Sequence, residues 1–270
     1  MTDKEFPWYD GGWLRCYHSA RQYLGANDVS ALATFEQQMA PLRTRRDFKP
    51  LLMKNLIQDD ILTALKTHLS LMSEDDMDPT EFFSFGRLIS TDVPILDELQ
   101  EQLATVVANA CKEKVERNYN FLSLYNNFGI CEPHMDAPEA KWTLDICIDQ
   151  SEPWPIYLSD TQEWPVPNPK TDSDLDWKSF ILSTVQFREY TLMPGDALLF
   201  SGSSQWHYRN RIEQRHSNNY CHLAFLHYVP EGCRKRCRPR RWASLFEQPG
   251  LATLPAIEDY ISEYESESKE

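Results

Sequence analysis

Three side chains of types that commonly bind metals are placed so that they can share one ion. His134 and Asp136 are separated by a single residue, and residues i and i+2 of an extended segment point to the same side, so the imidazole and the carboxylate converge. His207 follows the segment PGDALLF at 194–200, a turn and a strand that would deliver it to the same place. Two histidines and one carboxylate on one face of iron(II) leave positions open for a co-substrate and O₂. A His-x-Asp pair alone is often an ordinary polar pair in a strand, so it is the combination with His207 that predicts a metal site.

The part of the chain that carries these residues has the pattern of short antiparallel strands. Apolar or alternating segments are separated by turns that contain Pro, Gly and Asn, and this pattern favours a sandwich or barrel over βαβ units. The expected strands lie within 119–229, at 121–127, 142–148, 187–192, 197–200 and 220–229. The sequence therefore predicts an all-β core.

Helices are predicted upstream of this core. Apolar residues recur at helical spacing in 58–72 and again from Pro94 to Ala110, so we expect helices within 58–112 that buttress a sheet. Residues 160–183 are polar and proline-rich and are predicted to be a long surface loop, in a position where a flap could cover the metal. The expected organisation is an N-terminal extension packed on the core (1–50), a central domain that carries the candidate metal ligands (51–230) and a C-terminal extension with an acidic tail (231–270).

Composition excludes several classes of function. The formal net charge is −14, which argues against nucleic-acid binding because phosphate contacts need a basic face. No run of about 18 apolar residues predicts a membrane span, and the first residues lack the features of a secretory signal. We therefore expect a cytoplasmic protein with its seven cysteines reduced. The sequence does not indicate the oligomeric state.

The segments LYNNFGICEPHMDAPEAKWTLDICID, YTLMPGDALLF, WHYRN and LAFLHYV resemble the iron(II)/2-oxoglutarate-dependent dioxygenase superfamily, over roughly residues 50–230. The resemblance implies a double-stranded β-helix (a cupin-like jelly roll) with His134, Asp136 and His207 as the metal ligands. It also implies Fe(II), 2-oxoglutarate and O₂ as cofactors. The implied reaction is oxidation of an aliphatic C–H bond of a small organic molecule, with hydroxylation the default outcome and desaturation or cyclisation as others.

One feature of that superfamily is missing. Most members carry an Arg or Lys early in the last strand that binds the far carboxylate of 2-oxoglutarate, whereas residues 216–219 here read His-Ser-Asn-Asn. Arg209 is predicted to take this role, because it lies two residues after His207 on the same face and a guanidinium can grip a carboxylate bidentately. A structural ion pair is the alternative role for Arg209, and Arg215 is the alternative cation.

Further site residues are expected on neighbouring strands. Tyr125 lies on the strand before His134, where members of the superfamily often place a phenol that hydrogen-bonds the co-substrate, and Asn127 is expected on the same face; a core tyrosine is the alternative. His222 and His227 are on opposite faces of the last strand, so at most one faces the interior. Two other functions stay open: an iron-dependent oxidase of the same fold that does not use 2-oxoglutarate, and a non-catalytic metal-binding cupin-like module.

Overall fold

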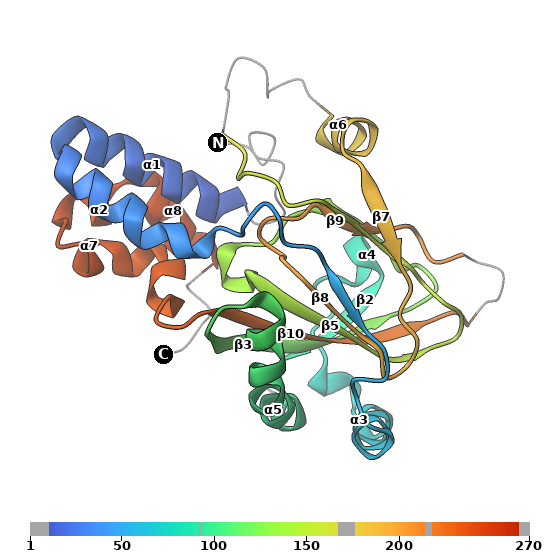
Figure 1. Cartoon of the computed structure of the whole chain (residues 1–270). Helices are drawn as coiled ribbons and strands as arrows, with labels where there is room; N and C mark the ends of the chain where they lie inside the picture. The colour runs from blue at the N-terminus through green and yellow to red at the C-terminus, as the bar shows by residue number, and fades with distance from the viewer. Residues whose placement is uncertain (1–10, 92, 167–175, 214–217, 265–270) are drawn as a thin grey trace.

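Two antiparallel β-sheets face each other and form the centre of the molecule (Figure 1). The structure is a computed structural model that describes residues 11–91, 93–166, 176–213 and 218–264. Within these residues the larger sheet has the order β1-β8-β5-β10-β3-β2 and the smaller sheet the order β4-β9-β6-β7. The strands are β1 (Leu51–Met53), β2 (Arg87–Thr91), β3 (Val115–Tyr125), β4 (Cys131–His134), β5 (Trp142–Gln150), β6 (Ile156–Ser159), β7 (Phe187–Tyr190), β8 (Ala197–Phe200), β9 (His207–Arg209) and β10 (Cys221–Pro230).

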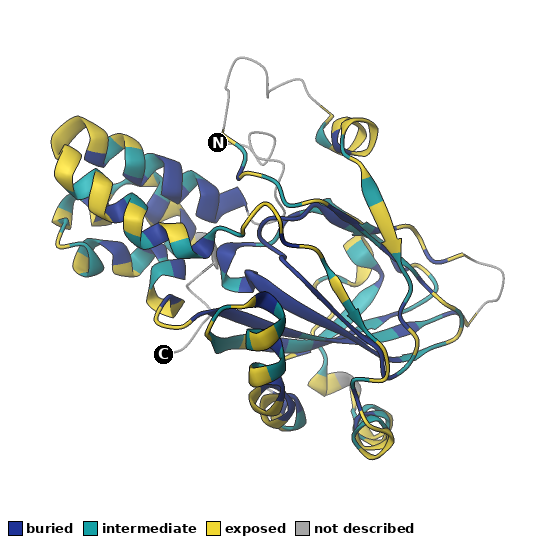
Figure 2. Ribbon diagram, in the orientation of Figure 1, coloured by how far each residue is buried: buried dark blue, intermediate teal, exposed yellow. Residues whose placement is uncertain are grey.

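From β3 onward the chain passes back and forth between the two sheets, which is the topology of a double-stranded β-helix. The predicted jelly-roll core is thus confirmed. β5 shows why such strands are apolar on both sides: Leu144 and Ile146 face the helices outside the larger sheet, whereas Cys147 faces the smaller sheet. A strand covered on both faces loses the simple alternation of buried and exposed residues, and β5 is accordingly dark over most of its length in Figure 2.

Helices cover the outer face of the larger sheet and the end of the molecule. Within the described residues they are α1 (Gly11–Asn27), α2 (Val29–Met39), α3 (Asp59–Leu71), α4 (Phe82–Phe85), α5 (Pro94–Cys111), α6 (Trp177–Thr184), α7 (Trp242–Leu245) and α8 (Pro255–Tyr264), with short 3-10 turns between some of them. α3 and α5 match the two helices predicted from periodicity. Leu65, Leu99 and Leu103 on these helices are buried in one cluster with the outer face of the sheet.

The two ends of the chain pack against each other. α1 and α2 lie beside α7 and α8 at one end of the barrel (Figure 1), and we call these four helices the terminal helical unit. The rings of Trp13, Phe35 and Trp242 meet edge to face at its centre, with centroids 5.4 and 5.5 Å apart. In the N-terminal extension, the described residues from Gly11 to Met39 form two regular helices.

Three local predictions differ from the structure. The strand expected at 121–127 ends at Tyr125, because the Asn126 side chain and carbonyl accept hydrogen bonds from the N–H groups of Phe128 and Gly129 and form a turn. The loop expected at 160–183 is interrupted by α6, which begins at Trp177, and residues 167–175 lie outside the described residues. The short strands β1, β2, β4, β6 and β9 were not predicted, because strands of three to five residues carry little periodicity.

Two predictions from composition can be compared with the structure. All seven cysteines are in the described residues and none is in a disulfide. In the part of the chain that the structure describes, every helix is too short or too polar to cross a membrane.

Candidate metal centre

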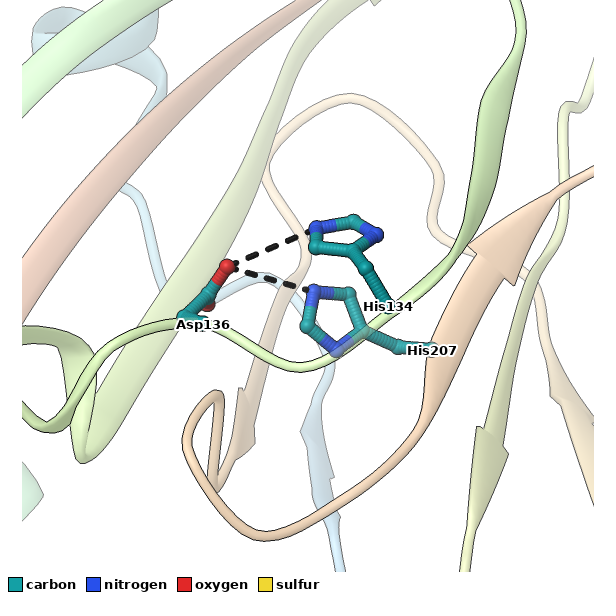
Figure 3. Close-up of side chains that lie close together, drawn as sticks. All are labelled: His134, Asp136 and His207. Atoms are coloured by element: carbon teal, nitrogen blue, oxygen red, sulfur yellow. Dashed lines mark ion pairs between the residues drawn. The ribbon is translucent and has the colours of Figure 1, made fainter. Parts of the chain in front are cut away.

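The three predicted ligands meet between two paired strands and the loop that follows one of them. His134 ends β4, His207 begins β9, and the two residues are register partners in the smaller sheet. Asp136 Oδ1 lies 3.4 Å from His134 Nε2 and 3.7 Å from His207 Nε2 (Figure 3). One ligand atom from each residue falls within 4.8 Å of the others, so the three donors surround one point.

Hydrogen bonds at the far side of both imidazoles select the tautomer that a metal needs. His134 Nδ1 is 2.7 Å from the carbonyl of Glu132, and His207 Nδ1 is 3.0 Å from the carbonyl of Gln205. A carbonyl can only accept, so each Nδ1 carries a proton and each Nε2 is the nitrogen that faces Asp136 and would bind a metal. Metal-binding histidines are usually oriented by such a bond. The donor set therefore fits a divalent transition metal.

The loop that carries Asp136 is held on two sides. The Asp136 N–H donates to the carbonyl of Gly202 at 2.9 Å, and a Cβ at Gly202 would lie only 2.2 Å from Asp136 Oδ2. Any side chain at Gly202 would therefore displace the carboxylate. On the other side, the Met135 side chain is fully buried in the same apolar cluster as the terminal helical unit.

A buried amide holds the loop before His207. Gln205 accepts a hydrogen bond from the Ser201 N–H at 2.9 Å and donates to the carbonyl of Ser159 at 2.7 Å. The Ser159 hydroxyl in turn accepts from the N–H of Trp206 at 2.9 Å. Sequence reasoning missed Gln205 and Gly202, because their roles depend on partners that are distant in the chain.

Burial and charge set the protonation of the ligands in the absence of metal. Burial alone would raise the pKa of Asp136, but His207 and His134 outweigh it and hold that pKa well below the usual range of a carboxyl. Burial, together with the nearby His134, lowers the pKa of His207 to about 4. An ionised carboxylate and a neutral imidazole are the forms that bind metal, so Asp136 and His207 need lose no proton at neutral pH. His134 must lose one, because Cys131 and Asp136 outweigh burial and raise its pKa well above the ordinary value.

Arg209 points into the barrel, and the structure gives it a partner there. Its Nη2 lies 2.5 Å from Asp145 Oδ2, and its Nη1 donates to the carbonyl of Trp154, whose ring it covers at 5.0 Å. Arg209 thus forms the structural ion pair that was the alternative to co-substrate binding. A guanidinium has five N–H groups, so this pair does not exhaust its donors. Arg215 lies outside the described residues.

Tyr125 is buried at the end of β3 and is bonded to a cation that sequence reasoning missed. Its hydroxyl accepts from Arg87 Nη1 at 2.8 Å, and Arg87 Nε lies 2.5 Å from Glu81 Oε2. Arg87 comes from β2, where it is the register partner of Tyr125. It precedes His207 by more than a hundred residues in the chain, so the spacing of cations after His207 does not reveal it. Asn127 lies in the turn after β3 and not on the face of Tyr125, since that strand has already ended.

The fold and the three ligands define a jelly-roll protein with a two-histidine, one-carboxylate site. No protein-family model and no curated protein matches the sequence. Solved structures do match. The non-heme alpha ketoglutarate dependent epimerase SnoN from nogalamycin biosynthesis aligns with a TM-score of 0.52 at 11% identity, over 74% of this chain and 87% of that chain.

Two structures with bound 2-oxoglutarate also align with this chain. HygX from Streptomyces hygroscopicus, with nickel and 2-oxoglutarate bound, gives a TM-score of 0.50 at 11% identity, over 68% of this chain and 83% of that chain. EctD from S. alaskensis, with 2-oxoglutarate and 5-hydroxyectoine, gives 0.50 at 15% identity, over 72% and 75%. The chain therefore has the fold of the iron- and 2-oxoglutarate-dependent oxygenases.

Proposed function

We propose that this protein is a non-haem iron(II)- and 2-oxoglutarate-dependent oxygenase that oxidises an aliphatic C–H bond of a small organic molecule. Hydroxylation is the default outcome, with desaturation or cyclisation as the other outcomes. The observation that carries the proposal is the convergence of His134, Asp136 and His207 with both imidazoles held in the metal-binding tautomer. The 2-oxoglutarate bound in similarly folded proteins supports the choice of co-substrate.

Each residue has a defined part in this proposal. His134, Asp136 and His207 hold iron(II) from one side, which leaves the other positions for ligands. Iron, 2-oxoglutarate and O₂ together supply the oxidising power for the C–H bond. Arg209 binds the far carboxylate of 2-oxoglutarate with donors that Asp145 does not use, or Arg215 does so in its place. Tyr125 contributes a polar contact at the co-substrate from the end of β3, and Asn127 contributes one from the turn that follows the strand.

An iron-dependent oxidase that does not use 2-oxoglutarate is the second candidate. In the described part of the last strand, the inward-facing residues Cys221, Leu223, Phe225 and His227 include no Arg or Lys. The one arginine on β9 is already paired with Asp145. Both observations argue against tight binding of the far carboxylate of 2-oxoglutarate. They favour a reaction in which the primary substrate supplies all the electrons.

Anaerobic titration separates these functions. Iron(II) is added to the metal-free protein, followed by 2-oxoglutarate, and the visible charge-transfer absorption of an iron–keto acid chelate is recorded. We expect the absorption in the wild type and in the His222→Ala control, whose side chain lies on the outer face of β10, and its loss in His134→Ala and His207→Ala. Iron binding without 2-oxoglutarate binding would favour the oxidase. No iron binding would contradict both proposals, and iron binding without O₂ consumption under any of these conditions would favour a metal-binding module.

A further inference from the structure

A row of rings lines the inner face of the larger sheet. Tyr119 and Phe121 come from β3, and Phe225 and His227 come from β10. The Tyr119 and His227 rings stack with centroids 4.2 Å apart, and the Phe121 and Phe225 rings with centroids 5.1 Å apart. We call these four residues the aromatic wall. They alternate along their strands with residues that face the outer helices, so the wall looks into the barrel.

The aromatic wall is partly exposed to solvent, whereas other parts of the inner faces of the same strands are covered by the smaller sheet. Cys221 and Leu223, farther along the inner face of β10, are each 1% exposed beneath the smaller sheet. Tyr119, by contrast, is 41% exposed, and Phe121 and Phe225 are half-buried. Ring surface left accessible on the inner face of a barrel is a surface for a ligand.

His227 is the buried end of the wall and has an unsatisfied nitrogen. Its Nδ1 lies 3.1 Å from Thr143 Oγ1, and the Thr143 hydroxyl donates to the carbonyl of Ala140 at 3.2 Å. His227 Nδ1–H therefore donates to Thr143, and Nε2 is left as an acceptor. That Nε2 is buried with no partner among the described residues. Buried polar atoms are rarely left in this state, so the atom calls for a partner that the described residues do not supply.

The same histidine lies close to the metal ligands. A Cβ at Gly202 would meet both Asp136 Oδ2, at 2.2 Å, and Thr143 Oγ1, at 2.7 Å. The Asp136 carboxylate and the hydroxyl bonded to His227 thus flank the same glycine. The aromatic wall therefore begins beside the metal centre and continues to the exposed ring of Tyr119.

We infer that the aromatic wall binds the primary substrate, and that His227 Nε2 accepts a hydrogen bond from a hydroxyl or amine of that substrate beside the metal. The substrate class is then a compound with an apolar or aromatic face and a hydrogen-bond donor close to the oxidised carbon. This inference rests on the proposed function and deepens it. A site built around a buried acceptor discriminates against analogues that lack the donor, because the acceptor is then left unpaired.

Phenol and toluene are suitable probes, because both have an aromatic face and only phenol has an O–H donor. Binding is measured by ligand-observed NMR on the full-length chain loaded with Zn(II). We expect His227→Phe to weaken phenol binding about fivefold to tenfold and to leave toluene binding unchanged. Phe121→Ser should weaken both. Phe83→Ser, at a 97% exposed position on α4, is the control and should change neither.

Two further measurements distinguish the loss of a specific hydrogen bond from misfolding of the variant. His227→Gln, whose amide oxygen can reach the position of Nε2, should restore part of the phenol affinity, and His227→Asn should not. In protein labelled with ¹⁵N-histidine, the Nε2 resonance that disappears in His227→Phe should shift on addition of phenol and not of toluene. Equal phenol binding by wild type and His227→Phe, or no binding of either probe to the wild type, would overturn the inference.

The binding test can succeed or fail separately from the oxygenase proposal, because binding of these probes to the Zn(II)-loaded protein requires no turnover. Loss of the phenol preference in His227→Phe, in a protein that shows no 2-oxoglutarate binding, would uphold the wall and refute the co-substrate. If the protein turns over 2-oxoglutarate but His227→Phe leaves phenol binding unchanged, the oxygenase proposal is upheld and the role of the aromatic wall is refuted.

Discussion

At the scale of single residues, the geometry of the candidate metal centre requires a glycine at position 202. Glycine is the only residue type that fits at position 202, since a Cβ there would lie 2.2 Å from Asp136 Oδ2 and 2.6 Å from the carbonyl oxygen of Ala140. We expect Gly202→Ala to weaken metal binding by about ten- to a hundredfold, as substitutions around metal ligands usually do. Metal titration of the folded protein measures this. Gly25→Ala, where a Cβ would make an ordinary 3.5 Å contact, is the matched control, and equal affinities in all three proteins would show that the loop adapts.

The buried pair of Arg209 and Asp145 supports a second prediction at the same scale. Both side chains are almost inaccessible, at 3% and 0% exposure. Arg209→Met removes one partner and leaves the other charge buried, which should cost about 3–5 kcal/mol in the free energy of unfolding. The double variant Arg209→Met/Asp145→Leu should recover most of this loss. Urea unfolding measures both variants.

The same variants separate the two roles of Arg209. If the single variant keeps its stability and loses only 2-oxoglutarate affinity, Arg209 serves the co-substrate alone and the ion pair contributes little. If it loses stability and the double variant recovers stability without 2-oxoglutarate affinity, the residue does both.

At the scale of elements, the turn before β8 is organised by one carboxylate. Asp196 accepts hydrogen bonds from the N–H groups of Met193 and Asn55 and from Lys54 Nζ, and so ties this turn to the end of β1. Gly195 in the same turn has a φ of +90°, which side chains rarely adopt. The turn and β8 together lead the chain toward His207.

Asp196 should make stability depend on pH. Burial opposes its ionisation, but its bonds to Lys54 and to the two N–H groups lower its pKa below the ordinary value. A depressed folded-state pKa stabilises the fold above the unfolded-state pKa, and this stabilisation is lost as the pH falls through the lower folded-state value. Asp196→Asn should therefore reduce the free energy of unfolding by about 1–3 kcal/mol near neutral pH.

The difference from the wild type should shrink below about pH 4. Chemical unfolding across this pH range measures it, with the exposed Glu98→Gln as the control. A difference that stays constant with pH would mean that the carboxylate charge does not contribute.

At the scale of the whole molecule, the terminal helical unit supports the metal loops. Trp13 of α1 packs against Trp164, with ring centroids 5.2 Å apart, and Trp164 Nε1 donates to the carbonyl of Ser203 at 3.0 Å in the loop before His207. Met135, between two metal ligands, is buried in the same apolar cluster. We propose that the described parts of residues 1–50 and 231–270, which are distant in sequence, act as one structural unit on the core domain of 51–230.

This arrangement predicts that one substitution affects both ends of the chain. Trp242→Ala should cost about 3–5 kcal/mol, and hydrogen exchange should accelerate together in α1, α2, α7 and α8 while β5 and β10 keep their protection. Metal affinity should fall as well, because Met135 loses part of its packing. Equal acceleration in β5 and β10 would show that the helices and the barrel unfold as one cooperative unit.

The three candidate metal ligands, the all-β core and the helices α3 and α5 could be predicted from the amino-acid sequence. These features depend on residue types and on periodicity within one segment, as with the His-x-Asp spacing that places two ligands on one face. The pairs of residues that contact each other across strands and sheets became apparent only in the folded structure. Arg209 meets Asp145 from 64 positions away, and the aromatic wall exists only because β3 and β10 pair in one register. Periodicity shows which side of a strand is buried, but the partner on that side is set by strand register and packing, which depend on the whole chain at once.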